Sequence, residues 1–274
     1  MPGLVRVEPA AMFELSSPQP ALQGWIYPLL FGTGLLAGFV DSIAGGGGVI
    51  TIPVLLSVGL PPQVALGTNK LQATFGSGSA AWHFWRAGLV PFQRWWLGVA
   101  MTLVGATIGT LCVSRLNPDF LRQSIPWLLI GIALYLLVQP NAGQAGSRPR
   151  FDVVAFQVCC GLGIGFYDGF FGPGTGTFWA MAFVTCLGFD LRSATAHTKL
   201  MNFASNVASL AVFLMIGQVH VRAGLCMGVG QWCGARLGSG MVIRRGVGWV
   251  RPLFIVMALS VTARLVWLNF HRGR

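Results

Sequence analysis

The stretch "DSIAGGGGVI", residues 41–50, places one carboxylate and four consecutive glycines inside an otherwise apolar part of the chain. Glycine weakens a helix, and an ionised carboxylate is costly to hold in lipid. A second stretch of the same kind, "DGFFGPGTGT", covers residues 168–177. Each stretch predicts an interrupted helix, whose freed backbone groups need protein or water as hydrogen-bonding partners because lipid offers none.

The composition indicates what surrounds these stretches. Of the 274 residues, 54% are hydrophobic and 9% are charged, and the mean hydropathy is +0.68. A soluble domain carries roughly 25% charged residues. Apolar runs recur from Trp25 to Leu268, and many approach the roughly 20 residues needed to cross a bilayer. The sequence therefore predicts an all-α polytopic membrane protein.

The charge and the cysteines exclude several other classes of protein. The net charge is +11, but the arginines are spread between the apolar runs rather than gathered on one face or tail. Basic loops beside membrane spans contact anionic lipids, so we expect membrane lipids, and no nucleic acid, as partners. The six cysteines form no CxxC pair, and the chain contains no Walker motif. We therefore expect no metal, no cofactor and no enzymatic activity.

Four short blocks recur in the same order in both halves of the chain. "GFVDSIAGGGG" at 38–48 corresponds to "GFYDGFFGPGT" at 165–175, and "GTNKL" at 67–71 corresponds to "AHTKL" at 196–200. The pairs GLV and GQV, then GATIG and GARLG, follow in the same order. The pattern predicts two repeats. The tail, first repeat, polar linker and second repeat are expected at residues 1–24, 25–139, 140–150 and 151–270.

Each repeat is expected to hold about five helical segments. The expected segments cover residues 25–40, 47–60, 65–84, 95–113 and 124–139, and then 153–167, 174–188, 195–216, 223–242 and 250–268. Because five is odd, the second repeat enters the membrane from the opposite side, and we predict inverted topology. The segments beside each break form either a broken helix or a hairpin of short helices near the midplane.

The only two lysines occupy corresponding positions in the two repeats. Lys70 and Lys199 lie inside apolar segments, where an embedded charge costs at least about 2.5 kcal/mol. One interpretation is structural pairing, or snorkelling of the side chain to the membrane surface. The other, which we favour, is a site that binds an anion. The neighbouring polar candidates for that site are Thr68, Asn69, Thr198 and Asn202.

Asp41 and Asp168 come immediately before the two breaks. They suit capping of the next helix or pairing with a lysine, which we favour, or binding of a coupling proton. His197 is a weaker candidate for a proton carrier, because the first repeat has no matching histidine. Helix N-termini after the breaks present N–H groups that suit an anion. The resulting substrate-binding candidates are Gly46, Gly47, Gly48, Gly174 and Thr175.

The ordered blocks resemble the TauE/SafE family of sulfite and organosulfonate exporters. The resemblance rests on "GFVDSIAGGGGVITIPVLLSVGLPPQVALGTNKL" at 38–71 and "ATAHTKLMNFASN" at 194–206. It implies a carrier of small sulfur anions, such as sulfite, sulfoacetate or thiosulfate, in a bacterial inner membrane. The family's asparagine before the lysine is Asn69 in the first repeat but Thr198 in the second. This departure implies an asymmetric site.

These patterns together predict a secondary transporter of small oxyanions that works by alternating access at a lysine-lined midplane site. An anion channel, or a transporter of another small solute or of a divalent metal, is the alternative. A homo-oligomer is compatible with the sequence.

Overall fold

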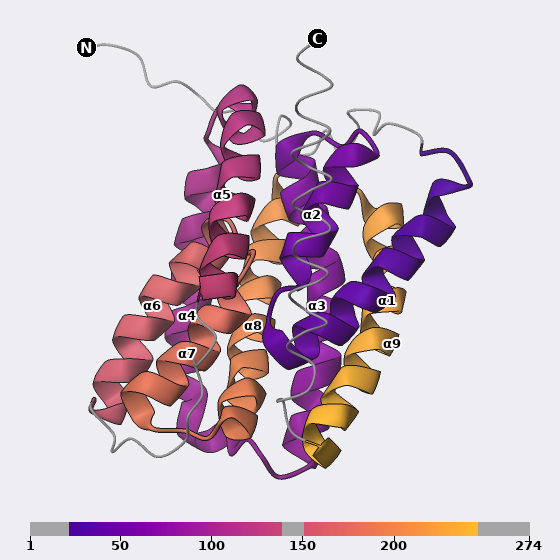
Figure 1. The fold of residues 1–274 in the computed structure, drawn as a ribbon. Coiled ribbons are helices and arrows are strands. Elements are labelled where there is room, and N and C mark those ends of the chain that lie inside the picture. The colour runs from indigo at the N-terminus through magenta and orange to yellow at the C-terminus, as the bar shows by residue number, and fades with distance from the viewer. Residues whose placement is uncertain (1–21, 139–150, 246–274) are drawn as a thin grey trace, which may run out of the picture.

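The computed structural model describes residues 22–138 and 151–245. Within them the chain forms nine α-helices and no strand (Figure 1), which confirms the all-α class. The helices are α1 (Ile26–Ala44), α2 (Gly47–Ser57), α3 (Pro62–Arg86), α4 (Phe92–Ser114), α5 (Pro118–Val138), α6 (Val153–Phe170), α7 (Thr175–Leu187), α8 (Leu191–Met215) and α9 (Val221–Arg245). The expected linker at 140–150, the segment at 250–268 and most of the tail lie outside the described residues.

Helices occupy all nine expected segments that fall in the described part of the chain, but two of them, α5 and α8, begin at least four residues earlier than expected. The fifth segment was expected from residue 124, whereas α5 begins at Pro118, because proline is tolerated in the first turn of a helix. The eighth was expected from residue 195, whereas α8 begins at Leu191. The carboxylate of Asp190 accepts the backbone N–H groups of Arg192 and Ser193, which caps this extra turn.

Both predicted breaks lie where the glycines stand. Gly45 follows α1 with φ of 80°, and Gly174 precedes α7 with φ of 79°. This left-handed region is open to glycine and costly for other residues. The next helices are short, with 11 residues in α2 and 13 in α7. At 1.5 Å per residue they measure about 16 and 20 Å, less than the roughly 30 Å of a bilayer core.

Three helices of the described chain are long and apolar enough to cross a membrane: α1, α4 and α6. The longer helices α3 and α8 have lower hydropathy because each carries a lysine and several amide and hydroxyl side chains. Most of these polar side chains are buried inside the protein. Polar groups therefore face the centre of the helical assembly, while apolar surface faces outward.

Each sequence half packs its first helix against the fourth helix of the other half. The helix α1 runs along α9, and α6 runs along α4. Glycines form both contacts, since a Cβ on Gly38 would overlap the backbone of Gln231 and a Cβ on Gly105 would overlap that of Leu162. Small residues of the GATIG block thus permit close packing of α4 on α6. We call these two contacts the glycine seams.

The contacts along the helices also fix their relative directions. In the α1 and α9 seam, Gly34 meets Met227 and Gly38 meets Gln231, so these two helices run parallel. In the α4 and α6 seam, Gly105 and Gly109 meet residues that likewise ascend in number, so these helices are also parallel. By contrast, α3 and α8 run antiparallel, because Gly67 of α3 meets Phe213 of α8 whereas Gly78 meets Phe203.

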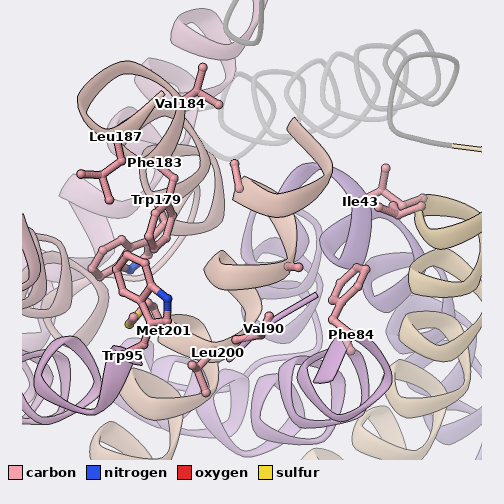
Figure 2. Close-up of a cluster of buried hydrophobic side chains, with 14 of the residues drawn as sticks. Ile43, Phe84, Val90, Trp95, Trp179, Phe183, Val184, Leu187, Leu200 and Met201 are labelled. Carbon is pink, nitrogen blue, oxygen red and sulfur yellow. The ribbon is translucent and has the colours of Figure 1, made fainter. Parts of the chain in front are cut away.

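An aromatic cluster fixes α7 against α8 and α4. Trp179 and Phe183 of α7 are fully buried, and the ring of Trp95 from α4 lies 5.2 Å from that of Phe183, edge to face. Figure 2 shows these rings beside Met201 of α8. Aromatic pairs of this geometry contribute about 0.5–1.5 kcal/mol beyond their burial. The short helix that follows the second break is therefore held firmly at its far end.

Candidate functional site

The two break regions touch each other at the centre of the molecule. A Cβ on Gly45 would overlap the backbone of Gly176, and the reverse is also true. The hydroxyl of Thr177 donates a 2.9 Å hydrogen bond to the carbonyl of Ala44. The glycines at both positions therefore have a packing reason, because only a residue without a side chain permits this backbone contact.

A polar cavity of about 30 Å³ lies between the two break regions. Its lining combines backbone of both breaks with side chains of α1, α3, α6, α8 and α9: Asp41, Gly45, Gly48, Asn69, Ala73, Asp168, Gly172, Gly174, Thr175, Gly176, Asn202, Asn206 and Gln231. The volume has room for about two water molecules. A larger solute requires the break regions to move apart.

Two ion pairs cross between the sequence halves next to this cavity. The ammonium nitrogen Nζ of Lys70, on α3, lies 2.6 Å from Oδ1 of Asp168, on α6. The ammonium of Lys199, on α8, lies 3.0 Å from Oδ2 of Asp41, on α1. Both lysine side chains are 1% exposed. The expected pairing of aspartate with lysine is confirmed, and snorkelling to the membrane surface is wrong.

The two pairs differ in how completely they are bonded. Asp168 binds Lys70 through Oδ1 and through its backbone carbonyl, and its Oδ2 accepts the hydroxyl of Ser205. Asp41 binds Lys199 through Oδ2, and its Oδ1 accepts the N–H of Gly47 at the start of α2. The exposed fraction of the side chain is 5% for Asp168 and 16% for Asp41. Capping is thus confirmed at Asp41.

The residues before the lysines also differ between the halves. Oδ1 of Asn69 accepts the hydroxyl of Thr51 and the amide of Gln72, at 2.6 and 2.7 Å. Its counterpart Thr198 is buried, and its hydroxyl has no partner among the described residues. The carbonyl Oδ1 of Asn202 is also buried without a partner there. Buried polar atoms are normally satisfied. Asn202 lines the cavity, where a donor can reach its Oδ1, whereas Thr198 is not among the lining residues.

The remaining predicted residues are spread around the cavity or away from it. Gly48, Gly174 and Thr175 line it, whereas the N–H of Gly47 is used by Asp41. Gly46 precedes α2 as its N-terminal cap residue. Thr68 immediately precedes Asn69 on α3 but does not line the cavity, and its hydroxyl accepts the N–H of His220.

His197 lies in the aromatic cluster rather than at the cavity. Its ring centroid is 5.0 Å from that of Trp95 and 5.0 Å from that of Phe189. Its Nδ1 lies 2.7 Å from the carbonyl of Ser193. The described neighbours therefore assign His197 a packing position, two residues from Lys199 along α8.

Gln231 and Asn206 line the cavity without having been selected as site candidates. Asn206 follows Asn202 by four residues and shares its helix face, so the spacing alone points to it. Gln231 of α9 precedes the GARLG block, and the signal for it is an amide inside an otherwise apolar helix. Its contact with Gly38 and Gly76 comes from tertiary packing, which no sequence pattern contains.

The electrostatics of the site are balanced. Two carboxylates line the cavity, the described lining includes neither lysine, and each carboxylate has one ammonium directly behind it. Buried ion pairs of this kind are costly to break, because removing one partner leaves an uncompensated charge. The cavity therefore offers amide and hydroxyl groups at its surface, and a cation only when a lysine leaves its aspartate.

The fold and this site define a helical membrane protein with a polar centre between two broken segments. The family profile described as "Sulfite exporter TauE/SafE" matches residues 30–265. The chain belongs to the TauE/SafE family of membrane transporters.

Relatives span most of the chain. The probable membrane transporter protein YfcA of Escherichia coli K12 is 45% identical over 239 residues, which is 87% of this chain and 89% of that protein. A probable membrane transporter protein of Haemophilus influenzae is 42% identical over 246 residues, 88% of this chain and 96% of that protein. The TauE/SafE family protein 6 of Arabidopsis thaliana, named a sulfite exporter, is 30% identical over 102 residues, 37% of this chain and 24% of that protein. No solved structure matches the chain.

Proposed function

We propose that the protein is a secondary transporter of small sulfur oxyanions, such as sulfite, thiosulfate or sulfoacetate, and that it spans a bacterial inner membrane several times. The observation that carries the proposal is the meeting of two broken segments, one from each half, at a closed polar cavity flanked by crossed lysine–aspartate pairs. Interrupted helices at corresponding positions are the usual setting of a secondary transporter site.

The proposed architecture is a pair of inverted repeats. Reciprocal packing supports it, because α1 on α9 and α6 on α4 are the same contact with the halves exchanged. Helix direction supports it too, since α1, α3 and α9 run together while α4, α6 and α8 run the opposite way. Two short hairpins then enter from opposite faces, and rocking about the central contact opens the cavity to one side at a time.

In the proposed binding step the anion replaces a carboxylate on a lysine. Lys199 is the better candidate, because Asp41 is the more exposed and less fully bonded aspartate. The substrate oxygens then accept hydrogen bonds from Lys199 and from amide donors of Asn69 and Asn202. Lys70 stays beside the second break and adds positive charge behind Gly172. A Cβ added to Gly172 would lie 3.0 Å from Nζ of Lys70.

Charge balance favours uptake of one proton by Asp41 in the same step. The charged groups around Asp41 are Lys199 of α8, Asp168 of α6 and, behind it, Lys70 of α3. The short helices α2 and α7 carry no charged residue, and Arg236 of α9 lines a different pocket, on another side of α3. An anion arriving beside two carboxylates is repelled unless one of them is neutral. A proton from water on the open side therefore accompanies the anion.

Reconstitution into proteoliposomes tests the transport function. The purified protein is given a panel of sulfite, thiosulfate, sulfoacetate, sulfate and divalent metal ions, with counterflow of each. We expect saturable counterflow of at least one sulfur oxyanion, and loss of it in K199A but not in R222A, which removes an exposed arginine far from the site. Normal transport by both K199A and K70A contradicts a lysine-centred site.

A divalent metal is the second candidate substrate, because two carboxylates line the cavity. Their ammonium partners oppose it, and no cluster of three or more metal-ligating side chains occurs among the described residues. Metal counterflow without oxyanion counterflow in the same panel would favour this candidate. Transport that does not saturate and shows no counterflow would instead identify a channel.

A further inference from the structure

A second and much larger pocket lies on another side of α3. It is a groove of about 550 Å³ between α3, α8 and α9, open along one side. It shares no lining residue with the central cavity. Volumes of about 300–1,000 Å³ are typical of pockets that hold a complete small ligand.

The two ends of the groove differ in chemistry. Towards the middle of α3 it is lined by Phe75 and Gly78, together with Phe203 of α8. Towards the end of α3 it is lined by Arg86 and, from α9, Arg236. The two tryptophans on its walls, Trp82 and Trp232, are 55% and 52% exposed.

The two arginines at this end are available to a ligand. Both are exposed, and neither lies within ion-pair distance of any carboxylate in the described part of the chain. Cζ of Arg86 lies 5.9 Å from the ring centre of Trp82, which orients the guanidinium along the wall of the groove. Two unpaired guanidinium groups favour phosphate, which each can bind through two parallel hydrogen bonds.

The length of the groove matches one leaflet of a bilayer. Its lining on α3 runs from Thr74 to Arg86, which is about 18 Å at 1.5 Å per residue. Half of a bilayer core is about 15 Å. A ligand with its phosphate at Arg86 and an acyl chain over Phe75 would therefore have the dimensions of a lipid in that leaflet. Tryptophans beside the arginines stand at the level where the headgroup begins.

We propose that this groove, which we call the α3–α9 groove, binds one anionic phospholipid of the surrounding membrane. The phosphate lies between Arg86 and Arg236, and one acyl chain follows Phe75, Gly78 and Phe203. The occupant is a lipid rather than a soluble oxyanion, because the side chains of the apolar half can contact an acyl chain but offer no hydrogen bond to a small anion.

Native mass spectrometry of the full chain in detergent, with phosphatidylglycerol or phosphatidylethanolamine added, tests the proposal. We expect one phosphatidylglycerol retained in preference to phosphatidylethanolamine. An arginine near a membrane surface adds about fivefold to the attraction of an anionic lipid, so R86Q/R236Q should lower that preference about 25-fold. R222Q, which removes an exposed arginine at the other end of α9, is the matched control and should retain the lipid.

A second variant separates a groove from general surface charge. A Cβ at position 78 would lie 2.9 Å from Cε2 of Phe203, so G78L fills the apolar half and leaves both arginines in place. We expect loss of lipid retention in G78L with an unchanged melting temperature. The proposal is overturned if R86Q/R236Q or G78L retains the lipid like the wild type. It is also overturned if inorganic phosphate at equal concentration displaces the lipid.

Discussion

The pair Lys70–Asp168 and the pair Lys199–Asp41 occupy corresponding places in the two halves, yet they are built differently. Asp168 uses both carboxylate oxygens and its backbone carbonyl on Lys70 and Ser205. Asp41 borders the cavity, is three times as exposed, and divides its two oxygens between Lys199 and a helix N-terminus. In the proposed binding step, the first pair is a fixed support and the second pair is an exchangeable contact.

Breaking the fixed pair should produce the largest effect. K70A leaves the charge of Asp168 buried without its partner, and such losses destabilise by about 3–5 kcal/mol. We expect poor folding, measured as loss of a monodisperse peak and of a thermal transition in detergent. The double variant K70M/D168N removes both charges and should recover much of the stability. If K70A alone melts like the wild type, Lys70–Asp168 is not the support of the fold.

Breaking the exchangeable pair should affect transport more than stability. A hydrogen bond to a charged group contributes about 1.5–3 kcal/mol, so K199A should lower the initial rate of anion uptake about 10- to 100-fold. D41N should bind substrate yet lose its dependence on a pH gradient, because its amide takes up no proton. Uptake by proteoliposomes with and without a pH gradient measures both. Equal loss of stability in K199A and K70A would remove the distinction between the pairs.

Substitution of the residue before each lysine should have different effects on the melting temperature in the two halves. N69A leaves Thr51 and Gln72 with unmade hydrogen bonds inside the protein, which costs about 1–3 kcal/mol. T198V removes a hydroxyl that has no described partner, so its melting temperature should stay equal or rise slightly. Differential scanning fluorimetry of both variants checks the contrast. If the melting temperature falls as much in T198V as in N69A, the hydroxyl of Thr198 already has a hydrogen-bond partner.

The smallest expected effect concerns the N-terminal caps of α3 and α8, the two helices that carry the lysines. α3 begins after Pro61 with no side-chain cap, whereas Asp190 caps α8. Partial burial alone would raise the pKa of Asp190, but hydrogen bonds from the side chain and backbone of Ser193 and from the backbone of Arg192 outweigh it, so the pKa is lowered. This stabilisation is present above the carboxyl's ordinary pKa and is lost as the pH falls through the lowered one.

D190A should therefore lower stability by about 1 kcal/mol at neutral pH. The difference from the wild type should shrink in acid, as seen in melting temperatures measured across that range. The matched change P61A removes no cap bond and should show no such pH dependence. A difference that grows as the pH falls would contradict the capping role.

Most of the fold could be predicted from the sequence, because the signals for helices and for breaks are local. The glycine run at 45–48 and the Gly/Pro stretch at 172–176 mark the breaks, and apolar runs locate the helices to within six residues. The partner of each lysine was harder to predict. Asp41 and Asp168 were expected to pair with a lysine, but pairing across the halves depends on how α1 and α6 pack against α8 and α3. Such long-range packing leaves no periodic pattern in the chain.

Part of the asymmetry of the site could be predicted from the sequence, and part could not. The change from Asn69 to Thr198 can be read directly. Its consequence depends on Thr51 and Gln72, which close a hydrogen-bonded triad around Asn69. The contact between Gly45 and Gly176 likewise required coordinates, because glycine in a sequence signals freedom of the backbone but not what approaches it.

The glycine seams have a consequence for biogenesis. Each seam joins a helix of the first half to one of the second, so residues 25–139 alone contain half of each seam and the whole of neither. When this half leaves the ribosome and enters the membrane, α1 and α4 present their glycine-lined faces without the helices that cover them. Assembly of the core therefore waits for insertion of α6 and α9, and the two halves complete their folding together.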